Sequence, residues 1–468
     1  MKAVFRSLAV ASGVTLTLGL IGASPAPGTP GNLPGLGPAA TSLMHGDVES
    51  TDSTPLPGPG RGGRLAASSV PGGVCAATFV GSDGYPVSLC TAYLDGSPPQ
   101  IATPVVTLFH PKTAQVLAKL PLAKGGLLGG VYGYLDDEDR VVVADGTGAI
   151  LRVGHHRTAS GWKLTVDDRT DASRHLGGDG ITGLAPDYRG RTWFATTNGV
   201  IGTVGTAGRI ATTRLPEGEA LGNGLTIHRG GASVLTTHAL YEMRAGADGV
   251  PRTVWRRAYD RGAARKPGQL TWGSGTTPTY FGPGGDSWVA IVDNAPVPKL
   301  HVLRAADGST VCTTRAFAES PQGTENSPMA WGSSLVIPST YGFQYPPMAV
   351  TGDSRPATAP FRGAMTRIDV VNGECKRAWS SHDRMATLPR LSREDGLIHA
   401  LAYGPYRGGP QQLGPVNYVG VDFATGKRVV SKKVGDAPLD EPMQLTGMIG
   451  PGGVLWQGTV GRMLKVGR

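Results

Sequence analysis

The chain has 468 residues, of which 71 are glycine and 37 are proline, and only 17% are charged. This length suits one large repeat domain or two to three ordinary domains, and the many turn residues between short apolar runs favour an all-β protein over a helical one. The net charge of +9 comes from scattered Lys and Arg residues rather than from a basic stripe, so nucleic acid is not an expected partner.

The first 26 residues have the pattern of a secretory signal peptide. Lys2 and Arg6 precede an apolar run from Leu8 to Ile21, and small residues follow at positions 23–26. The apolar run is short for a membrane span, and no other segment is apolar enough to form one. We therefore predict a secreted, extracellular protein that has no membrane span after signal cleavage and is a monomer.

Residues 27–70 are rich in proline, glycine and small polar residues, as in the stretch Pro55-Leu-Pro-Gly-Pro-Gly-Arg-Gly-Gly. Such a composition offers little apolar surface to bury, so it predicts a disordered linker. The folded part of the chain is then expected to be one domain at residues 71–468.

A repeated unit runs through this domain. Each copy has a turn rich in Gly or Asp, an apolar-alternating strand, a polar turn and a further strand. The eight copies begin at Gly81, Asp136, Asp187, His228, Gly282, Ala330, Arg393 and Gly450.

A second, outer hairpin follows the repeated turn in several copies, at residues 105–117, 301–312, 366–379 and 418–430. Four short strands in a unit of roughly 50 residues predict a β-propeller. We predict eight blades, with seven as the alternative because the first copy is the least regular. The last copy ends after its third strand, so the segment just before Gly73 is expected to supply the missing outer strand and close the ring.

The outer hairpins carry a resemblance to a known group of propellers. The stretch Asp422-Phe-Ala-Thr-Gly-Lys-Arg-Val-Val, and more loosely residues 369–379, resembles the Asp-x-x-Thr-Gly-x-x-x-Trp repeat of quinoprotein-like propellers. The resemblance implies that the Gly makes the turn and that the Trp docks onto the neighbouring blade. Enzymes of that group stack the quinone cofactor PQQ on a disulfide between adjacent cysteines. This chain has no such pair, so PQQ is not expected.

The four cysteines of an exported chain predict two disulfides. Three pairings are open, as are free buried thiols. Cys75 and Cys90 fall on neighbouring strands of one hairpin, which leaves Cys312 to pair with Cys375.

Propeller topology predicts where functional side chains gather. The first strand of each blade lines the axial channel, and its start lies on the same face as the loop between the second and third strands. The starts of these inner strands contain Asp179, Asn223, Thr276, Thr277, Glu325, Asn326, Thr387 and Glu441. The loops on that face contain Asp145, Asn198, His238, Asp293, Asn294, Tyr341 and Tyr403.

Carboxylates and amides dominate this ring, and such oxygen ligands suit calcium rather than zinc. The predicted metal ligands are the two pairs from consecutive blades, Asp293 with Asn294 and Glu325 with Asn326, and Glu325 and Asp293 are the predicted catalytic residues. The others, among them Asn223, Asp179 and Tyr341, are expected to contact the ligand. The arrangement resembles that of calcium-dependent six-bladed lactonases and their lyase relatives.

The structural alternative is that Asp and Asn residues at these turns bond their own backbone. Three functions remain open. The first is a metal-assisted hydrolase or lyase acting on a small organic substrate. The second is a non-catalytic propeller that binds a protein, glycan or cell-wall component on its face, and the third is a quinone-dependent dehydrogenase.

Overall fold

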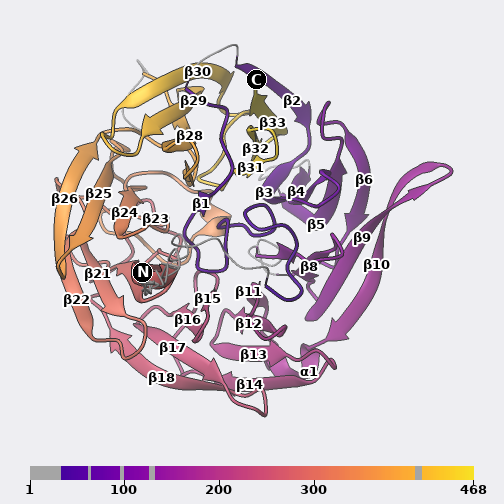
Figure 1. Cartoon of the computed structure of the whole chain (residues 1–468), viewed down its shortest axis with the longest axis horizontal. Helices are drawn as coiled ribbons and strands as arrows, with labels where there is room; N and C mark the ends of the chain where they lie inside the picture. Colours follow the sequence, from indigo (N-terminus) through magenta and orange to yellow (C-terminus); the bar gives the residue numbers. More distant parts are fainter. Residues whose placement is uncertain (1–32, 62–64, 95–99, 126–131, 406–413) are drawn as a thin grey trace, which may run out of the picture.

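A computed structural model describes residues 33–61, 65–94, 100–125, 132–405 and 414–468. Eight blades of four antiparallel strands each stand around a central axis, as Figure 1 shows, so the predicted eight-bladed propeller is confirmed. The predicted signal peptide at residues 1–26 lies outside the described residues. Among those described, no helix is long and apolar enough to cross a membrane.

The first four blades follow one another in sequence order. Blade 1 has β3 (Val74–Val80), β4 (Pro86–Leu94), β5 (Gln100–Phe109) and β6 (Val116–Pro121), and blade 2 has β7 (Tyr134–Leu135), β8 (Val141–Ala144), β9 (Ala149–Thr158) and β10 (Gly161–Asp171). The short helix α1 (Ser173–Leu176) leads into blade 3. Blade 3 has β11 (Ile181–Pro186), β12 (Thr192–Thr196), β13 (Val200–Val204) and β14 (Ile210–Arg214), and blade 4 has β15 (Thr226–His228), β16 (Gly231–Leu235), β17 (Ala239–Ala245) and β18 (Pro251–Ala258).

The second half of the ring completes the circle. Blade 5 has β19 (Thr279–Phe281), β20 (Trp288–Val292), β21 (Lys299–Arg304) and β22 (Thr310–Arg315), with the 3₁₀ turn η1 (Pro283–Gly285) between its first two strands. Blade 6 has β23 (Met329–Trp331), β24 (Ser334–Pro338), β25 (Met365–Val371) and β26 (Glu374–Ser381), with η2 (Pro347–Ala349) in its long loop. Blade 7 has β27 (Arg390–Ser392), β28 (Leu397–Tyr403), β29 (Pro415–Asp422) and β30 (Arg428–Asp436), and blade 8 has β31 (Met448–Gly450), β32 (Val454–Gly458) and β33 (Arg462–Gly467).

The ring is closed by pairing of the two ends of the domain. Strand β2 (Ala66–Pro71) is the outer strand of blade 8 and pairs antiparallel with β33, from Ala66 opposite Gly467 to Pro71 opposite Arg462. The predicted closure by N- and C-terminal strands is therefore confirmed.

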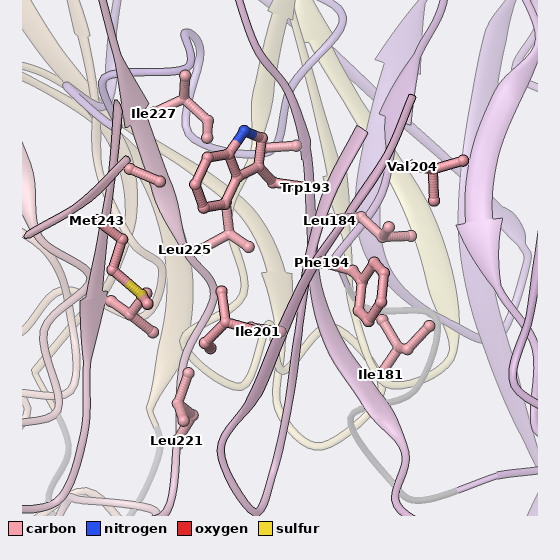
Figure 2. Packing of buried hydrophobic residues seen from close by; sticks show 14 of the residues in the cluster. Ile181, Leu184, Trp193, Phe194, Ile201, Val204, Leu221, Leu225, Ile227 and Met243 are labelled. Carbon is pink, nitrogen blue, oxygen red and sulfur yellow. The ribbon is translucent and has the colours of Figure 1, made fainter. Parts of the chain in front are cut away.

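Apolar side chains pack between neighbouring blades because adjacent residues of a strand point to opposite faces of the sheet. In blade 3, Trp193 lies with Leu225 and Met243 of blade 4, whereas Phe194 lies on the other side of the sheet with Leu184 (Figure 2). Trp193 and Phe194 are both fully buried. This two-sided burial explains why the middle strands read as nearly continuous apolar runs.

The turns of the outer hairpins dock as the quinoprotein-like motif implies. The backbone and hydroxyl of Thr425 both donate to Oδ1 of Asp422, at 3.0 and 2.9 Å, which fixes the turn. Trp379 of blade 6 donates its indole N–H to the carbonyl of Phe423 in blade 7 at 2.9 Å. A Cβ at Gly426 would lie 2.6 Å from the Trp379 ring, so only glycine admits this contact.

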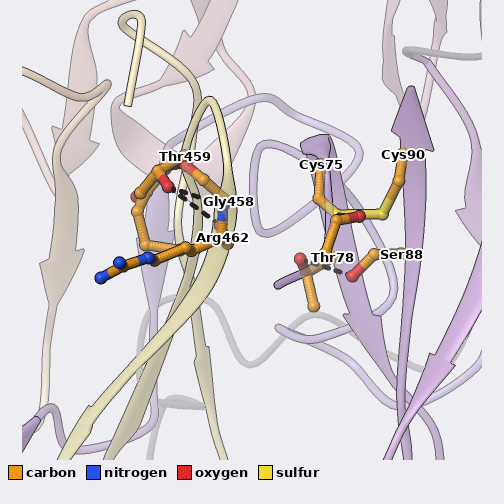
Figure 3. The surroundings of a disulfide bond; sticks show 9 residues. Cys75, Thr78, Ser88, Cys90, Gly458, Thr459 and Arg462 are labelled. Atoms are coloured by element: carbon orange, nitrogen blue, oxygen red, sulfur yellow. Dashed lines mark hydrogen bonds between the residues drawn. A yellow bond between two sulfur atoms is a disulfide. The ribbon is translucent and has the colours of Figure 1, made fainter. Parts of the chain in front are cut away.

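Both predicted disulfides are present. Cys75 and Cys90 join β3 and β4 within blade 1, beside the inner part of blade 8 (Figure 3). Cys312 and Cys375 join the outer strands β22 and β26 of blades 5 and 6, so this bond links two neighbouring blades. The four cysteines are all used, and neither disulfide is formed by adjacent residues.

The segment predicted as a linker has a different structure where it is described. We call residues 33–61 the plug. Its part up to β1 (Ser53–Thr54) lies at the centre of the ring, and β1 pairs in parallel with β27 (Figure 1). Plug carbonyls accept hydrogen bonds of 2.8 to 3.0 Å from inner-strand amides, namely those of Val80, Leu135, Ile227, Tyr280, Ala330 and Leu391.

The linker prediction is therefore wrong for this part of the chain. The amides at the inner edge of the ring would otherwise be unpaired, and the plug satisfies them with its own backbone. Leu33, Leu43 and Val48 are also buried against blades 2 to 4. Backbone bonding of this kind leaves no side-chain pattern, so composition alone could not reveal it.

Candidate functional site

One face of the propeller carries the starts of the inner strands and the loops between second and third strands, and we call it the loop face. At the channel end on this face, side chains from blades 4, 5 and 6 and from the connection before blade 2 come together. They include three residues predicted from sequence, Asn223, Thr277 and Glu325, and one that was not, Tyr132.

Glu325 is the most perturbed acid of this group. Its residue surface is 8% exposed, and its Oε2 accepts a hydrogen bond of 3.0 Å from the Leu270 amide. Its Oε1 is buried and has no hydrogen-bond partner among the described residues. Burial raises the pKa of Glu325 to about 8, although the Leu270 amide, the Asn223 side chain and the Arg265 charge act to lower it. The carboxyl is therefore mostly protonated at neutral pH.

Asn223 and Tyr132 form the neighbouring wall. The Tyr132 hydroxyl donates to Oδ1 of Asn223 at 3.3 Å, and Nδ2 of Asn223 donates to the carbonyl of Gly275 at 2.5 Å. Burial raises the pKa of Tyr132 to about 12, so the hydroxyl keeps its proton. Tyr132 also lies near Thr277, whose side chain lowers that pKa. These contacts fix a hydroxyl and an amide beside the Glu325 carboxyl.

A second buried acid lies in the connection that enters blade 8. Oε1 of Glu441 accepts hydrogen bonds from the Tyr403 hydroxyl at 2.6 Å and the Met443 amide at 2.8 Å. Its Oε2 is buried without a partner among the described residues, and burial raises the pKa of Glu441 to about 7. The pKa of Tyr345, a partly buried phenol, is raised by desolvation and by the charge of Glu325.

The plug contributes polar groups at the same end of the channel. Nδ1 of His45 lies 3.0 and 3.1 Å from the two carboxylate oxygens of Asp52. Asp52 is fully buried, accepts a hydrogen bond of 2.6 Å from the Ser327 hydroxyl, and forms an ion pair of 3.3 Å with Arg390. The His45 ring stacks beside Tyr132 with 6.4 Å between ring centroids. Ser327 follows Glu325 and Asn326 directly in the sequence, so the pair formed by His45 and Asp52 lies next to the Glu325 group.

Sequence reasoning missed His45, Asp52 and Tyr132. The first two lie in a segment assigned to a linker on composition, yet residues 45–52, His-Gly-Asp-Val-Glu-Ser-Thr-Asp, are far more polar than the Pro/Gly-rich stretches around them. That contrast is the signal that could have marked them.

Several predicted site residues make local hydrogen bonds. Oδ1 of Asp293 accepts the amides of Ala295 and Lys299, and its Oδ2 bonds His301 at 2.8 Å. Asp179 bonds the backbone and side chain of Asn198 at 2.6 and 3.1 Å. Asp293 thus stabilises its own turn, and Asp179 joins the start of blade 3 to the β12–β13 loop.

The remaining predicted residues are divided between blade contacts and a separate pocket. Thr276 bonds Ser274 at 2.9 Å within blade 5, and Nδ2 of Asn326 donates to Gln444 at 3.1 Å, which links blades 6 and 8. Tyr341 lines a cavity of about 280 Å³ at the rim, formed with residues 319–322 and 356–363.

The four predicted calcium ligands do not form a cage of converging oxygens. The Asp293 carboxylate is already engaged, and Nδ2 of Asn294 donates to the carbonyls of Arg261 and Ala264 at 2.8 and 3.0 Å. Only Oε1 of Glu325 and Oδ1 of Asn294 are buried oxygens without partners in this set. Within the described ranges, no three His, Cys, Asp or Glu side chains are grouped to hold a metal ion. Calcium binding by these four residues therefore stays a prediction.

Fold and site together define an eight-bladed β-propeller with a plugged channel and a polar, acid-containing group at the loop face. Similar folds occur in a quinohemoprotein alcohol dehydrogenase from Comamonas testosteroni (TM-score 0.56, 11% identity, 92% of this chain and 81% of that chain). A europium-containing methanol dehydrogenase is also similar (TM-score 0.55, 11% identity, 92% of this chain and 98% of that chain). The resemblance to quinoprotein-like propellers is confirmed at the level of fold, and these identities show the fold alone.

No known protein family matches the sequence. An uncharacterized protein from Archaeoglobus fulgidus is 23% identical over 312 residues, which are 60% of this chain and 59% of that protein. The chain thus matches about three fifths of the length of this relative.

Proposed function

We propose that this chain is an exported propeller protein that binds a small, oxygen-rich organic molecule at the loop face, and that Glu325 acts there as an acid in a hydrolase or lyase reaction. One observation carries the proposal: Glu325 is a buried acid with an unpartnered oxygen and a pKa of about 8, held at the start of an inner strand. Strongly perturbed acids in polar surroundings are typical of functional sites. The two disulfides support export from the cytoplasm.

The proposed role of Glu325 follows from its protonation. A neutral carboxyl can donate a hydrogen bond to a substrate oxygen and then transfer its proton to that oxygen as the bond to carbon breaks. Asn223 and Tyr132 would orient the substrate beside it, since both are fixed by the hydrogen bonds described above. General acid catalysis of this kind contributes typically about 10²- to 10⁴-fold in rate.

The test is turnover of a panel of lactones, aryl esters and glycosides by the full mature protein, compared with Glu325→Gln. Glutamine keeps the shape of the side chain and can still accept from the Leu270 amide, but it has no transferable proton. We expect kcat to fall at least about 100-fold while the melting temperature does not decrease.

Glu374→Gln is the matched control, because Glu374 lies on the outer strand of the same blade in an exposed ion pair with Lys376. It should behave as wild type. If the Glu325→Gln variant converts a panel member as fast as wild type, Glu325 is not the acid of the reaction. If wild type neither binds nor converts any member, the proposed function is wrong.

Calcium assistance is tested separately from the acid. A resident ion would appear as about one equivalent per chain in elemental analysis, and EDTA would lower the melting temperature because the ion binds only the folded protein. If the protein contains no metal and EDTA leaves the melting temperature unchanged, the calcium prediction is wrong. The proposed role of Glu325 as an acid does not depend on this result.

A second candidate is a non-catalytic propeller that binds a glycan or another extracellular component at its rim. The observation that favours it is the cavity of about 280 Å³ between the long loop of blade 6 and the connections that enter and leave this blade, which includes Tyr341, Arg362 and His382. Glycan binding that Tyr341→Ala abolishes and Glu325→Gln leaves unchanged would select this candidate. A quinone-dependent dehydrogenase is the third, and its support is the shared fold.

A further inference from the structure

His45 of the plug is held in one orientation by a buried carboxylate. Its Nδ1 faces both oxygens of Asp52 at 3.0 and 3.1 Å, and the Asp52 charge is balanced by Arg390 at 3.3 Å. Because a carboxylate can only accept hydrogen bonds, the neutral imidazole carries its proton on Nδ1. The other ring nitrogen, Nε2, is then a lone-pair acceptor.

That acceptor has no partner. Nε2 of His45 is buried and unbonded among the described residues, and only 8% of the residue surface is exposed. Leaving a buried polar atom without a hydrogen-bond partner is unfavourable, so a ligand that donates to this nitrogen relieves that cost. Two other buried histidines provide a comparison, since His228 and His399 have hydrogen-bond partners on both ring nitrogens.

The position of the ring connects it to the Glu325 group. The ring stacks beside Tyr132, whose hydroxyl donates to Asn223, and Ser327 bonds Asp52 two residues after Glu325. A base with a free lone pair and an acid with an unpartnered oxygen thus lie at the same end of the channel.

We propose that His45 is the proton acceptor of the loop-face site: a bound hydroxyl group or a water molecule donates to its Nε2. The inference rests on the proposed function. In hydrolysis, the water oxygen forms the new bond to carbon and its proton passes to Nε2 of His45. The carbon–oxygen bond of the leaving group breaks, and the leaving oxygen takes the proton of Glu325. Exchange with solvent then restores both groups, so the plug is part of the site.

The first test needs no substrate. Nitrogen-15 NMR of histidine-labelled protein at pH 7.5 distinguishes the two neutral tautomers, and His45→Gln assigns the resonance. We expect the proton of His45 on Nδ1 and none on Nε2. A proton on Nε2 would overturn the inference, because this nitrogen would then be a donor.

The second test uses the compounds of the panel above. Binding of a hydroxylated member should shift the His45 Nε2 resonance of wild type as it gains a hydrogen bond, and His45→Gln should lower kcat at least about 100-fold. His156→Gln is the control, since His156 is an exposed residue of the outer hairpin of blade 2. Turnover by His45→Gln within about threefold of wild type would overturn the inference.

The outcomes separate the two proposals. If wild type converts a compound, Glu325→Gln is inactive and His45→Gln is active, then the proposed function stands and the inference about His45 fails. If wild type converts nothing but a bound compound shifts Nε2, then His45 is an acceptor in a binding site and the catalytic function fails. If no compound binds, the proposed function fails. A proton on Nδ1 would then leave Nε2 as an acceptor for water, and a proton on Nε2 would overturn the inference about His45.

Discussion

Gly275 determines how closely the Glu325 carboxyl approaches the backbone of blade 5. A Cβ on this residue would lie 2.3 Å from Oε2 of Glu325 and 2.6 Å from the carbonyl of Thr324. Both distances are far below van der Waals contact, so the glycine is a requirement of packing rather than of backbone dihedrals.

We predict that Gly275→Ala destabilises the protein by about 1–3 kcal/mol and reduces loop-face activity, because Glu325 must move. Gly180→Ala is the matched control, since its Cβ would meet nothing within 4 Å and its exposed position is a surface site. Urea unfolding should place the control within about 0.5 kcal/mol of wild type. Equal stabilities for the two variants would contradict the tight packing described here.

Asp52 supports a second prediction for a single side chain. It is fully buried against Arg390, so Asp52→Ala leaves a buried charge without its partner, and we expect a loss of about 3–5 kcal/mol in the free energy of unfolding. Adding Arg390→Met removes that charge and should recover part of the loss. A double variant no more stable than Asp52→Ala would show that the ion pair is not the cause.

The sequence predicted part of the candidate site for a clear reason. Glu325, Asn223 and Thr277 lie at inner-strand starts, which propeller topology brings together. Asp293 occupies an equivalent loop, but nearby backbone amides and His301 occupy its carboxylate oxygens. The sequence does not show which of these local hydrogen bonds will form. His45 was unpredictable by repeat analysis because it belongs to no blade.

The two disulfides differ in what they connect and in the length of chain that they close. Cys75–Cys90 closes a loop of 15 residues within one hairpin, and Cys312–Cys375 closes one of 63 residues between two blades. The longer loop loses more conformational entropy in the unfolded chain when it is cross-linked.

We therefore predict that removing the Cys312–Cys375 bond by double alanine substitution costs more than removing Cys75–Cys90, by about 1 kcal/mol. Urea unfolding of both variants under identical conditions measures the difference. The reverse order would mean that strand packing around the bond, rather than chain entropy, determines its contribution.

Strands and turns were the most predictable elements of this chain. The pattern of alternating apolar runs and Gly-rich turns located all eight blades, since every blade needs the same hairpins. The plug was missed because it bonds through its backbone. The carbonyls of Val48, Glu49 and Asp52 accept hydrogen bonds from backbone amides of three different blades. Such contacts depend on the completed ring, which local composition cannot report.

The molecule as a whole contains several acids whose pKa is raised by burial. The pKa is raised to about 8 for Glu49 of the plug and for Glu325, and to about 7 for Glu441. A carboxyl whose pKa is higher in the folded chain stabilises it fully below the unfolded pKa near 4.5. That contribution is lost as the pH rises through the folded pKa.

We accordingly predict that the melting temperature falls as the pH rises from about 5 to 8.5. The triple variant Glu49→Gln, Glu325→Gln, Glu441→Gln should show a flatter profile, because glutamine does not titrate. Lys266 has a lowered pKa of about 8 in the folded chain. It therefore makes the folded chain more stable as the pH rises, but only above that pKa. A wild-type slope retained in the triple variant would assign the pH dependence to other groups.

The closure of the ring sets the order of events during biosynthesis. Strand β2 is made early, at residues 66–71, yet it pairs with β33 at residues 462–467, and the plug pairs with β27 at residues 390–392. A ribosome delivers these partners hundreds of residues apart, so the outer strand and the plug must wait for their partners while the blades between them are made. The channel can be filled and sealed only once nearly the whole polypeptide has emerged, which makes final assembly a post-translational step of high contact order.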